Sequence, residues 1–122
     1  MTETPTISLF RNVQDCVRYP AGDVIFSAGE EGELFYVVRE GTVTLSVAGE
    51  TLEEVGPGGV FGELALLDHV PRSATATAGT DCEVIPIDER RFCFLVGQTP
   101  FFALTVMRVM AARLRRATPG QS

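Results

Sequence analysis

Short hydrophobic segments recur through the first two thirds of the chain, and glycine-containing turns separate them. This pattern, which begins near Cys16 and ends near Ile87, predicts an antiparallel β-sandwich, barrel or jelly roll. In one segment Val43, Leu45 and Val47 alternate with hydroxyl side chains, which is typical of a strand with one buried face. The strands that we expect are 24–28, 34–39, 42–48, 51–55, 73–78 and 82–87.

The hydrophobic period becomes helical after Ile87. Asp88 is the expected N-cap of a first helix, because its side chain can accept from a free amide of the first turn. Thr99 followed by Pro100 then begins a second, longer helix, and arginines crowd the C-terminal end of that helix, where its dipole favours them. The second helix carries two adjacent apolar stripes, one formed by residues 103, 107, 110 and 114 and the other by Phe102, Val106 and Val109.

The width of this apolar helix face leaves two interpretations open. The face packs against the β domain, or it forms a pairing surface for a second copy of the chain. The second interpretation implies a homodimer through the C-terminal helix. A helix that acts as a lid over a bound ligand is compatible with both.

Composition indicates an ordinary globular protein. The chain has 122 residues, of which 45% are hydrophobic and 21% charged, and this length suits one domain. Its net charge is −6, and its basic residues are all arginine. An acidic chain without a lysine-rich tract is a poor candidate for duplex DNA or an anionic membrane, so we expect neither as a partner.

The cysteines and the N-terminus bear on the cellular compartment. Cys16, Cys82 and Cys93 form no CxxC pair and no Cys/His cluster, and an odd, scattered set favours reduced thiols over a disulfide framework. The first ten residues lack the basic start and apolar core of a signal peptide. No apolar run approaches the roughly 18 residues that span a bilayer. We therefore expect a cytoplasmic protein.

The segment FGELALLDHVPRSATATA, residues 61–78, combines one acid and one arginine with small or apolar neighbours. Glycines before it permit sharp turns, and free amides at a helix start after Glu63 would attract an anion. Arg72 offers paired donors to phosphate, whereas the Glu63 carboxylate can only accept, as from a sugar hydroxyl. These features favour a nucleotide with a single negative charge. A structural ion pair between Glu63 and Arg72 is the alternative.

The same segment resembles the phosphate-binding cassette of the cyclic nucleotide-binding domain family, which reads Phe-Gly-Glu-Leu-Ala and then Pro-Arg-Ser/Thr/Ala-Ala-Thr. The similarity extends over roughly residues 16–117, and over this range the chain is similar to the sensor domain of bacterial catabolite activator proteins. The resemblance implies a mainly β fold, an antiparallel β-roll or jelly roll (a double-stranded β-helix) with C-terminal helices. It implies one domain over 1–122, with a short N-terminal segment at 1–15, the β-roll at 16–87 and helices at 88–118.

The resemblance also implies roles for the charged residues of the cassette. Glu63 would accept a hydrogen bond from the ribose 2′-hydroxyl, and Arg72 would pair with the cyclic phosphate. The backbone N–H groups of Ala65 and Ala74 would bind the same phosphate. No metal and no further cofactor are implied beside the nucleotide.

Uncharged residues complete the site that the resemblance implies. Gly62 and Leu64 would line the sugar, and Leu45 and Leu52 would contact the base. Ser73 stands where bacterial cAMP receptors carry serine and where cGMP-selective members often carry threonine. The ligand that we expect is therefore cAMP, with cGMP as the alternative.

The chain departs from the family pattern at both ends. We therefore expect a standalone sensor that acts on an unidentified effector protein. Only a short segment, with one helical turn around Ser8–Asn12, precedes the first strand. The chain ends at Ser122 without the DNA-reading motif of the activators, so we expect no nucleic-acid binding. A ligand-free protein-interaction scaffold of the same fold is the alternative function. Catalysis is not expected, because one histidine, His69, cannot supply the ligand set of a metal cupin or a catalytic triad.

Overall fold

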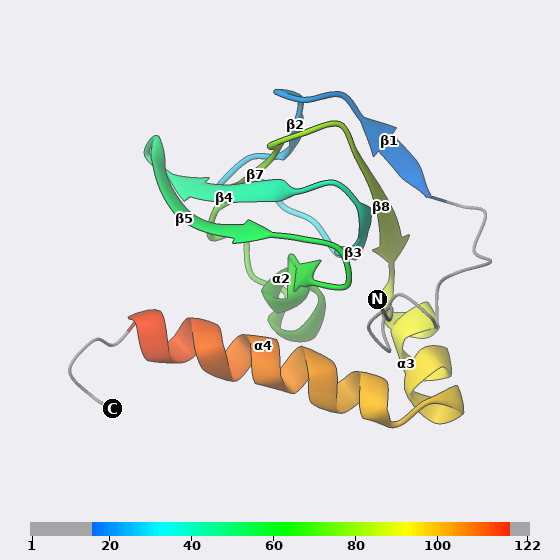
Figure 1. Ribbon diagram of the computed structural model, residues 1–122. Coiled ribbons are helices and arrows are strands. Elements are labelled where there is room, and N and C mark those ends of the chain that lie inside the picture. The colour runs from blue at the N-terminus through cyan, green and yellow to red at the C-terminus, as the bar shows by residue number, and fades with distance from the viewer. Residues whose placement is uncertain (1–15, 118–122) are drawn as a thin grey trace.

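The computed structural model describes residues 16–117, so the predicted segment 1–15, with its helical turn at Ser8–Asn12, lies outside the described residues. The described part is mainly β, with helices after the strands and one short helix among them (Figure 1). The strands are β1 (Val17–Tyr19), β2 (Val24–Phe26), β3 (Phe35–Glu40), β4 (Val43–Val47), β5 (Glu50–Val55), β6 (Val60–Phe61), β7 (Thr75–Ala78) and β8 (Cys82–Ile87). The helices are α2 (Glu63–Asp68), α3 (Glu89–Gln98) and α4 (Phe101–Ala117).

The strands form two antiparallel four-stranded sheets, which confirms the predicted β-roll. One sheet has the order β1-β8-β3-β6 and the other β2-β7-β4-β5. Each sheet therefore joins strands from distant parts of the sequence, as in the pairing of Val43 with Ala78 and of Val37 with Ile85. All of the strands expected from the sequence are present, β8 with the expected bounds and the others with one or both ends shifted, whereas β1 and β6 were not expected.

The central strands of the first sheet, β8 and β3, are buried on both faces, and this divides the apolar side chains into two clusters. Val37 and Val38 are adjacent in β3 and are both fully buried, but they point to opposite faces. One cluster fills the space between the sheets and consists of Phe26, Val38, Val43, Leu45, Val55, Phe61, Ala76, Ala78, Cys82 and Val84. The other joins the first sheet to the helices and consists of Phe35, Val37, Val60, Leu66, Ile85, Ile87, Leu95, Phe102 and Val106.

The first C-terminal helix, α3, starts as predicted, whereas α4 begins at Phe101, one residue after Pro100, and Thr99 is the C-cap of α3. The Asp88 side chain accepts a hydrogen bond of 2.8 Å from the backbone N–H of Arg91, as an N-cap does. Figure 1 shows α4 running across one end of the β-roll, next to α2. Within the described residues no helix combines the length and the apolar character that a membrane span requires.

The two stripes predicted for α4 have different surroundings. Phe102 and Val106, from the second stripe, are buried in the cluster under the first sheet. Met107 and Leu114, from the first stripe, are exposed. The helix therefore uses the second stripe to pack on the β domain and leaves much of the first stripe facing outward.

Candidate functional site

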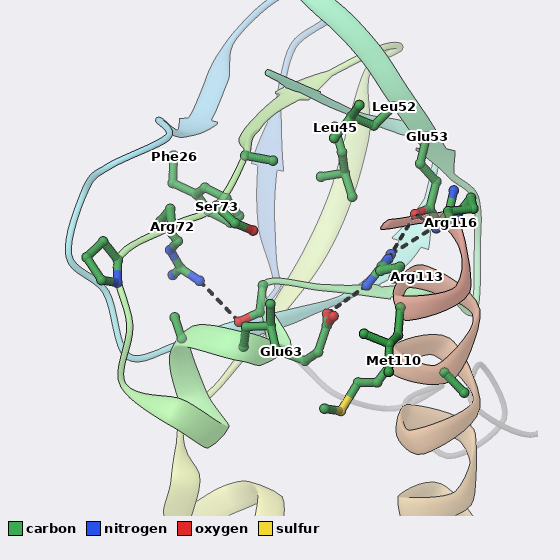
Figure 2. A pocket seen from close by; sticks show the side chains of 17 residues that line it. Phe26, Leu45, Leu52, Glu53, Glu63, Arg72, Ser73, Met110, Arg113 and Arg116 are labelled. Atoms are coloured by element: carbon green, nitrogen blue, oxygen red, sulfur yellow. Dashed lines mark hydrogen bonds and ion pairs between the residues drawn. The ribbon is translucent and has the colours of Figure 1, made fainter. Parts of the chain in front are cut away.

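A cavity of about 620 Å³ lies between the cassette, the β4–β5 pair and helix α4 (Figure 2). This volume suits a small-molecule ligand. Its walls include every residue that the sequence analysis proposed for the site. These residues are Leu45, Leu52, Gly62, Glu63, Leu64, Ala65, Arg72, Ser73 and Ala74.

Gly62 makes the turn that places the acid and the arginine at this cavity. It is the N-cap of α2 and has φ of 83°, in the left-handed region that glycine adopts most easily. A Cβ atom at this position would also lie 2.8 Å from Nη1 of Arg72. The backbone conformation therefore favours glycine here, and any larger residue would also displace the Arg72 guanidinium.

Arg72 is a buried cation at one end of the cavity, with an exposed fraction of only 7%. Its Nη1 donates to the carbonyl oxygen of Gly62 at 3.2 Å, and its guanidinium carbon lies 4.0 Å from the centre of the Phe26 ring. Burial lowers the pKa of Arg72, although the charges of Tyr36 and Glu30 act in the opposite direction. An arginine nevertheless stays protonated at neutral pH. Among residues 16–117, no carboxylate lies within ion-pair distance of this guanidinium.

The loop between β2 and β3 also holds Arg72. The backbone N–H of Arg72 donates to the carbonyl of Glu30 at 2.8 Å, and its own carbonyl accepts from Gly29 at 2.8 Å. A Cβ atom on Gly32 would lie 2.7 Å from Nη2 of Arg72. Gly32 therefore leaves the space that the guanidinium occupies, a positioning role that the sequence analysis did not assign.

Glu63 lies in the cavity wall but is paired with a residue that was not anticipated. Its exposed fraction is 4%, and its Oε1 accepts a hydrogen bond of 2.7 Å from Nη1 of Arg113 on α4. Arg72 instead donates to the Gly62 carbonyl. The alternative of a Glu63–Arg72 ion pair is therefore wrong, and the two residues are left to face a ligand separately.

A second carboxylate, Glu53 of β5, completes a cluster on the α4 side of the cavity (Figure 2). Nε of Arg113 donates to Oε1 of Glu53 at 2.9 Å, and Nη2 of Arg113 lies 3.2 Å from Oε2. Arg116 adds a contact of 2.7 Å to the same Oε1. Burial alone would raise the pKa of Glu53, but the hydrogen bonds from both arginines outweigh it and hold this pKa below its ordinary value. The cluster ties α4 to β5 across the cavity.

Sequence reasoning missed eight of the lining residues, among them all of those on α4. Arg113 carried a usable signal, because it follows Phe102 by eleven residues, about three helical turns, and so lies on the packed face of α4. The helix dipole, by which the sequence analysis explained the C-terminal arginines, does not account for its buried contacts. The residues that were missed are Phe26, Glu53, Pro71, Met110, Ala111, Arg113, Leu114 and Arg116.

The potential metal ligands are dispersed over the described residues. No three side chains of His, Cys, Asp or Glu gather there to hold an ion. His69 is exposed at the end of α2, and its Nε2 lies 3.9 Å from a carboxylate oxygen of Glu89. Its surroundings are those of a solvated surface side chain.

Comparisons with known proteins agree with this geometry. Residues 16–98 match the family described as Cyclic nucleotide-binding domain. The chain is 38% identical over 104 residues to the Cyclic AMP receptor protein of Thermus thermophilus, a match that covers 81% of the chain and 48% of that protein. It is 42% identical over 71 residues to the cAMP-dependent protein kinase regulatory subunit of Eremothecium gossypii, covering 58% and 16% respectively. The chain thus spans about half the length of the first relative and much less of the second.

A solved structure extends the likeness to almost the whole chain. It is described by the words "A cyclic-GMP-dependent signalling pathway regulates bacterial phytopathogenesis". Its TM-score is 0.75 with 28% identity, and the match covers 95% of this chain and 96% of the other. The fold is therefore shared with a protein of similar size as well as with longer ones.

Proposed function

The chain belongs to the cyclic nucleotide-binding domain family, and from this premise we propose that its cavity binds a cyclic nucleoside monophosphate, with cAMP the expected ligand. The family is a regulatory one and is generally non-catalytic. We propose the same for this chain: a cytoplasmic sensor that carries out no reaction and takes no cofactor beyond the nucleotide.

The observation that carries the proposal is the buried Arg72 guanidinium without a carboxylate partner among residues 16–117. Charged side chains are almost never buried unless they are paired, because desolvation is costly. A bound phosphate would supply the missing negative charge through two parallel hydrogen bonds. Ala65 and Ala74, whose amides are proposed to bind the same phosphate, line the cavity beside it.

The charges around the cavity favour a ligand with one negative charge. Its lining contains two carboxylates, Glu53 and Glu63, and three arginines, Arg72, Arg113 and Arg116. Since the cluster on α4 pairs the two carboxylates with two of the arginines, one positive charge remains, at Arg72. A cyclic phosphodiester carries a single charge, whereas an open phosphate monoester carries up to two. The proposed ligand therefore matches the site in charge.

The polar and apolar walls suit the rest of a nucleotide. Glu63 is placed to accept from a ribose hydroxyl, and Leu45 and Leu52 offer apolar surface to a base. The wall also includes side chains of α4, so a ligand that touches them would favour one position of that helix over another. Such a difference in affinity between helix positions is what a sensor requires to transmit binding to an effector protein.

A melting-temperature screen with cAMP, cGMP, AMP and cyclic di-GMP tests this proposal. A ligand that binds only the folded state stabilises it by about 2.7 kcal/mol at a hundredfold excess over its Kd. We expect the largest rise in Tm with cAMP, a smaller rise with cGMP, and little with AMP, which controls for the closed phosphate ring. No shift with any nucleotide, together with stable association with a partner protein, would support the ligand-free scaffold instead.

We also propose that the outward face of α4 pairs with a second copy of the chain. Leu104, Met107, Ala111 and Leu114 are all exposed, and the last two also line the cavity at its edge. Their separations of three, four and three residues are those of the a and d positions of a coiled coil.

The arginines beside this stripe favour a parallel pair. Arg108 and Arg115 both occupy the position that follows a d residue. In an antiparallel pair these positions face each other and would oppose two positive charges. In a parallel pair they face the positions of Ala103 and Met110 of the second copy, so the repulsion is avoided.

Acidic substitutions on the stripe test the homodimer. We expect sedimentation equilibrium of the wild-type chain to give twice the 13.2 kDa chain mass, and Leu104→Glu with Met107→Glu to give the chain mass alone. Neither residue lines the cavity, so nucleotide binding serves as the folding control. Val24→Glu, an equally exposed apolar position on β2, should leave the dimer intact. A wild-type chain that sediments as a monomer at every concentration would contradict this proposal.

A further inference from the structure

Arg113 is the side chain through which α4 reaches the centre of the cavity, and all of its hydrogen-bonding edges are in use. Nη1 donates to Glu63 at 2.7 Å, Nε and Nη2 contact the two carboxylate oxygens of Glu53, and Nη2 also donates to the carbonyl of Val60 at 2.7 Å. One guanidinium therefore joins α4 to β5, β6 and α2. Its orientation is set by these acceptors together.

We propose that Glu53 is a positioning residue of the nucleotide site: by holding the Nε and Nη2 edge of Arg113, it leaves Glu63 able to accept the sugar hydroxyl of the ligand. This inference rests on the proposed function, because it assumes that the nucleotide sugar binds at Glu63. Glu53 itself is expected to touch the arginines rather than the sugar.

The argument follows from the geometry of guanidinium and carboxylate groups. An arginine pairs with a carboxylate most strongly when two parallel N–H donors meet both carboxylate oxygens. Here Glu53 has taken that arrangement, and Glu63 receives one donor, at Oε1. Oε2 of Glu63 accepts none of the hydrogen bonds found within residues 16–117, so it is left for a ligand.

Without the Glu53 carboxylate, Nε of Arg113 loses its acceptor while Nη2 keeps the Val60 carbonyl, and among the described residues Glu63 is the carboxylate that remains in contact with this guanidinium. Glu63 is buried in the same cavity, and it would attract two donors in place of one. Both of its oxygens would then be occupied, and the sugar hydroxyl would have to displace a charge-assisted hydrogen bond. The site would lose its preference for the hydroxyl while its phosphate end, at Arg72, would remain intact.

The expected signature is a change in one ratio of affinities. In the wild-type chain, cAMP should bind more tightly than 2′-deoxy-cAMP, because a hydrogen bond to a charged group contributes a factor of roughly ten to a hundred. In Glu53→Gln this ratio should fall at least about threefold. A general loosening of α4 would weaken both ligands equally, so it would leave the ratio unchanged.

Matched variants separate this role from charge and from helix attachment. Glu54→Gln removes the same charge from the adjacent, exposed position of β5, so it should keep the wild-type ratio. Arg116→Gln removes the second contact between α4 and Glu53 but leaves Arg113 in place; since Arg116 also lines the cavity, both affinities should change together and their ratio should be kept. Glu53→Asp keeps the carboxylate but places it one methylene further from Arg113, so it should give an intermediate ratio. This variant carries the test if Glu53→Gln does not fold.

Calorimetric titration of all five proteins with cAMP and 2′-deoxy-cAMP carries out the test. A ratio that falls in Glu53→Gln and is kept in Glu54→Gln and Arg116→Gln supports the inference. An unchanged ratio in Glu53→Gln, or an equal fall in Glu54→Gln, overturns it while the proposed function stands. A wild-type chain that binds neither ligand would overturn both.

Discussion

Arg72→Ala is expected to weaken cyclic nucleotide binding by roughly tenfold to a hundredfold or more, because it removes charge-assisted hydrogen bonds that contribute about 1.5–3 kcal/mol. The substitution also removes the one positive charge of the cavity that the α4 cluster does not pair. Isothermal titration with cAMP measures the effect. A variant that binds cAMP as tightly as the wild type would show that the phosphate does not bind at Arg72.

Two further variants make this result specific. Arg90→Ala removes an arginine from the exposed face of α3, so it controls for net charge and should bind as the wild type does. Arg72→Lys keeps the charge but offers a single ammonium in place of a planar fork, so we expect an affinity between those of the wild type and Arg72→Ala. The Tm of each free protein establishes that the fold is retained.

The β-roll was predictable because its principal strands carry their own signal. The alternation in β4 and the apolar runs of β3 and β8 are local patterns, and each is bounded by turn residues. The strands β1 and β6 have three and two residues, too few for any period to appear. Each forms by pairing with another strand, β1 with the distant β8 and β6 with β3, and no local window of sequence contains both partners.

The residues of the candidate site were also predictable only where the signal is local. One contiguous segment, 61–78, supplies the acid, the arginine and the small residues, so a local motif was sufficient to find them. Glu53 and Arg113 lie sixty residues apart in sequence, and their partnership depends on how α4 crosses the roll. Their residue types gave no sign of it, since arginine near a helix end and glutamate on an exposed strand both have ordinary explanations. The spacing of Arg113 from Phe102 indicates its helix face but not its partner.

The position of α4 therefore decides whether the cavity has its second wall, and Phe102 is the side chain that holds the start of this helix. It is 2% exposed, and its ring lies 6.2 Å from that of Phe35 on β3 and 5.9 Å from that of Phe92 on α3. Phe35 and Phe92 also meet edge to face at 5.6 Å. Three aromatic rings thus connect both C-terminal helices to the first sheet.

Phe102→Ala should lower the free energy of unfolding by about 3–5 kcal/mol, the usual cost of removing a buried phenylalanine ring and leaving a cavity. Phe101→Ala is the matched control, because the neighbouring ring is 44% exposed and should cost under about 1 kcal/mol. Urea unfolding at one fixed protein concentration measures both, since a dimer would make stability depend on concentration. The cAMP affinity of Phe102→Ala should fall as well, because a loosened α4 no longer fixes Arg113 against Glu63. Equal losses of stability in the two variants would mean that contacts other than the aromatic cluster hold α4 on the β-roll.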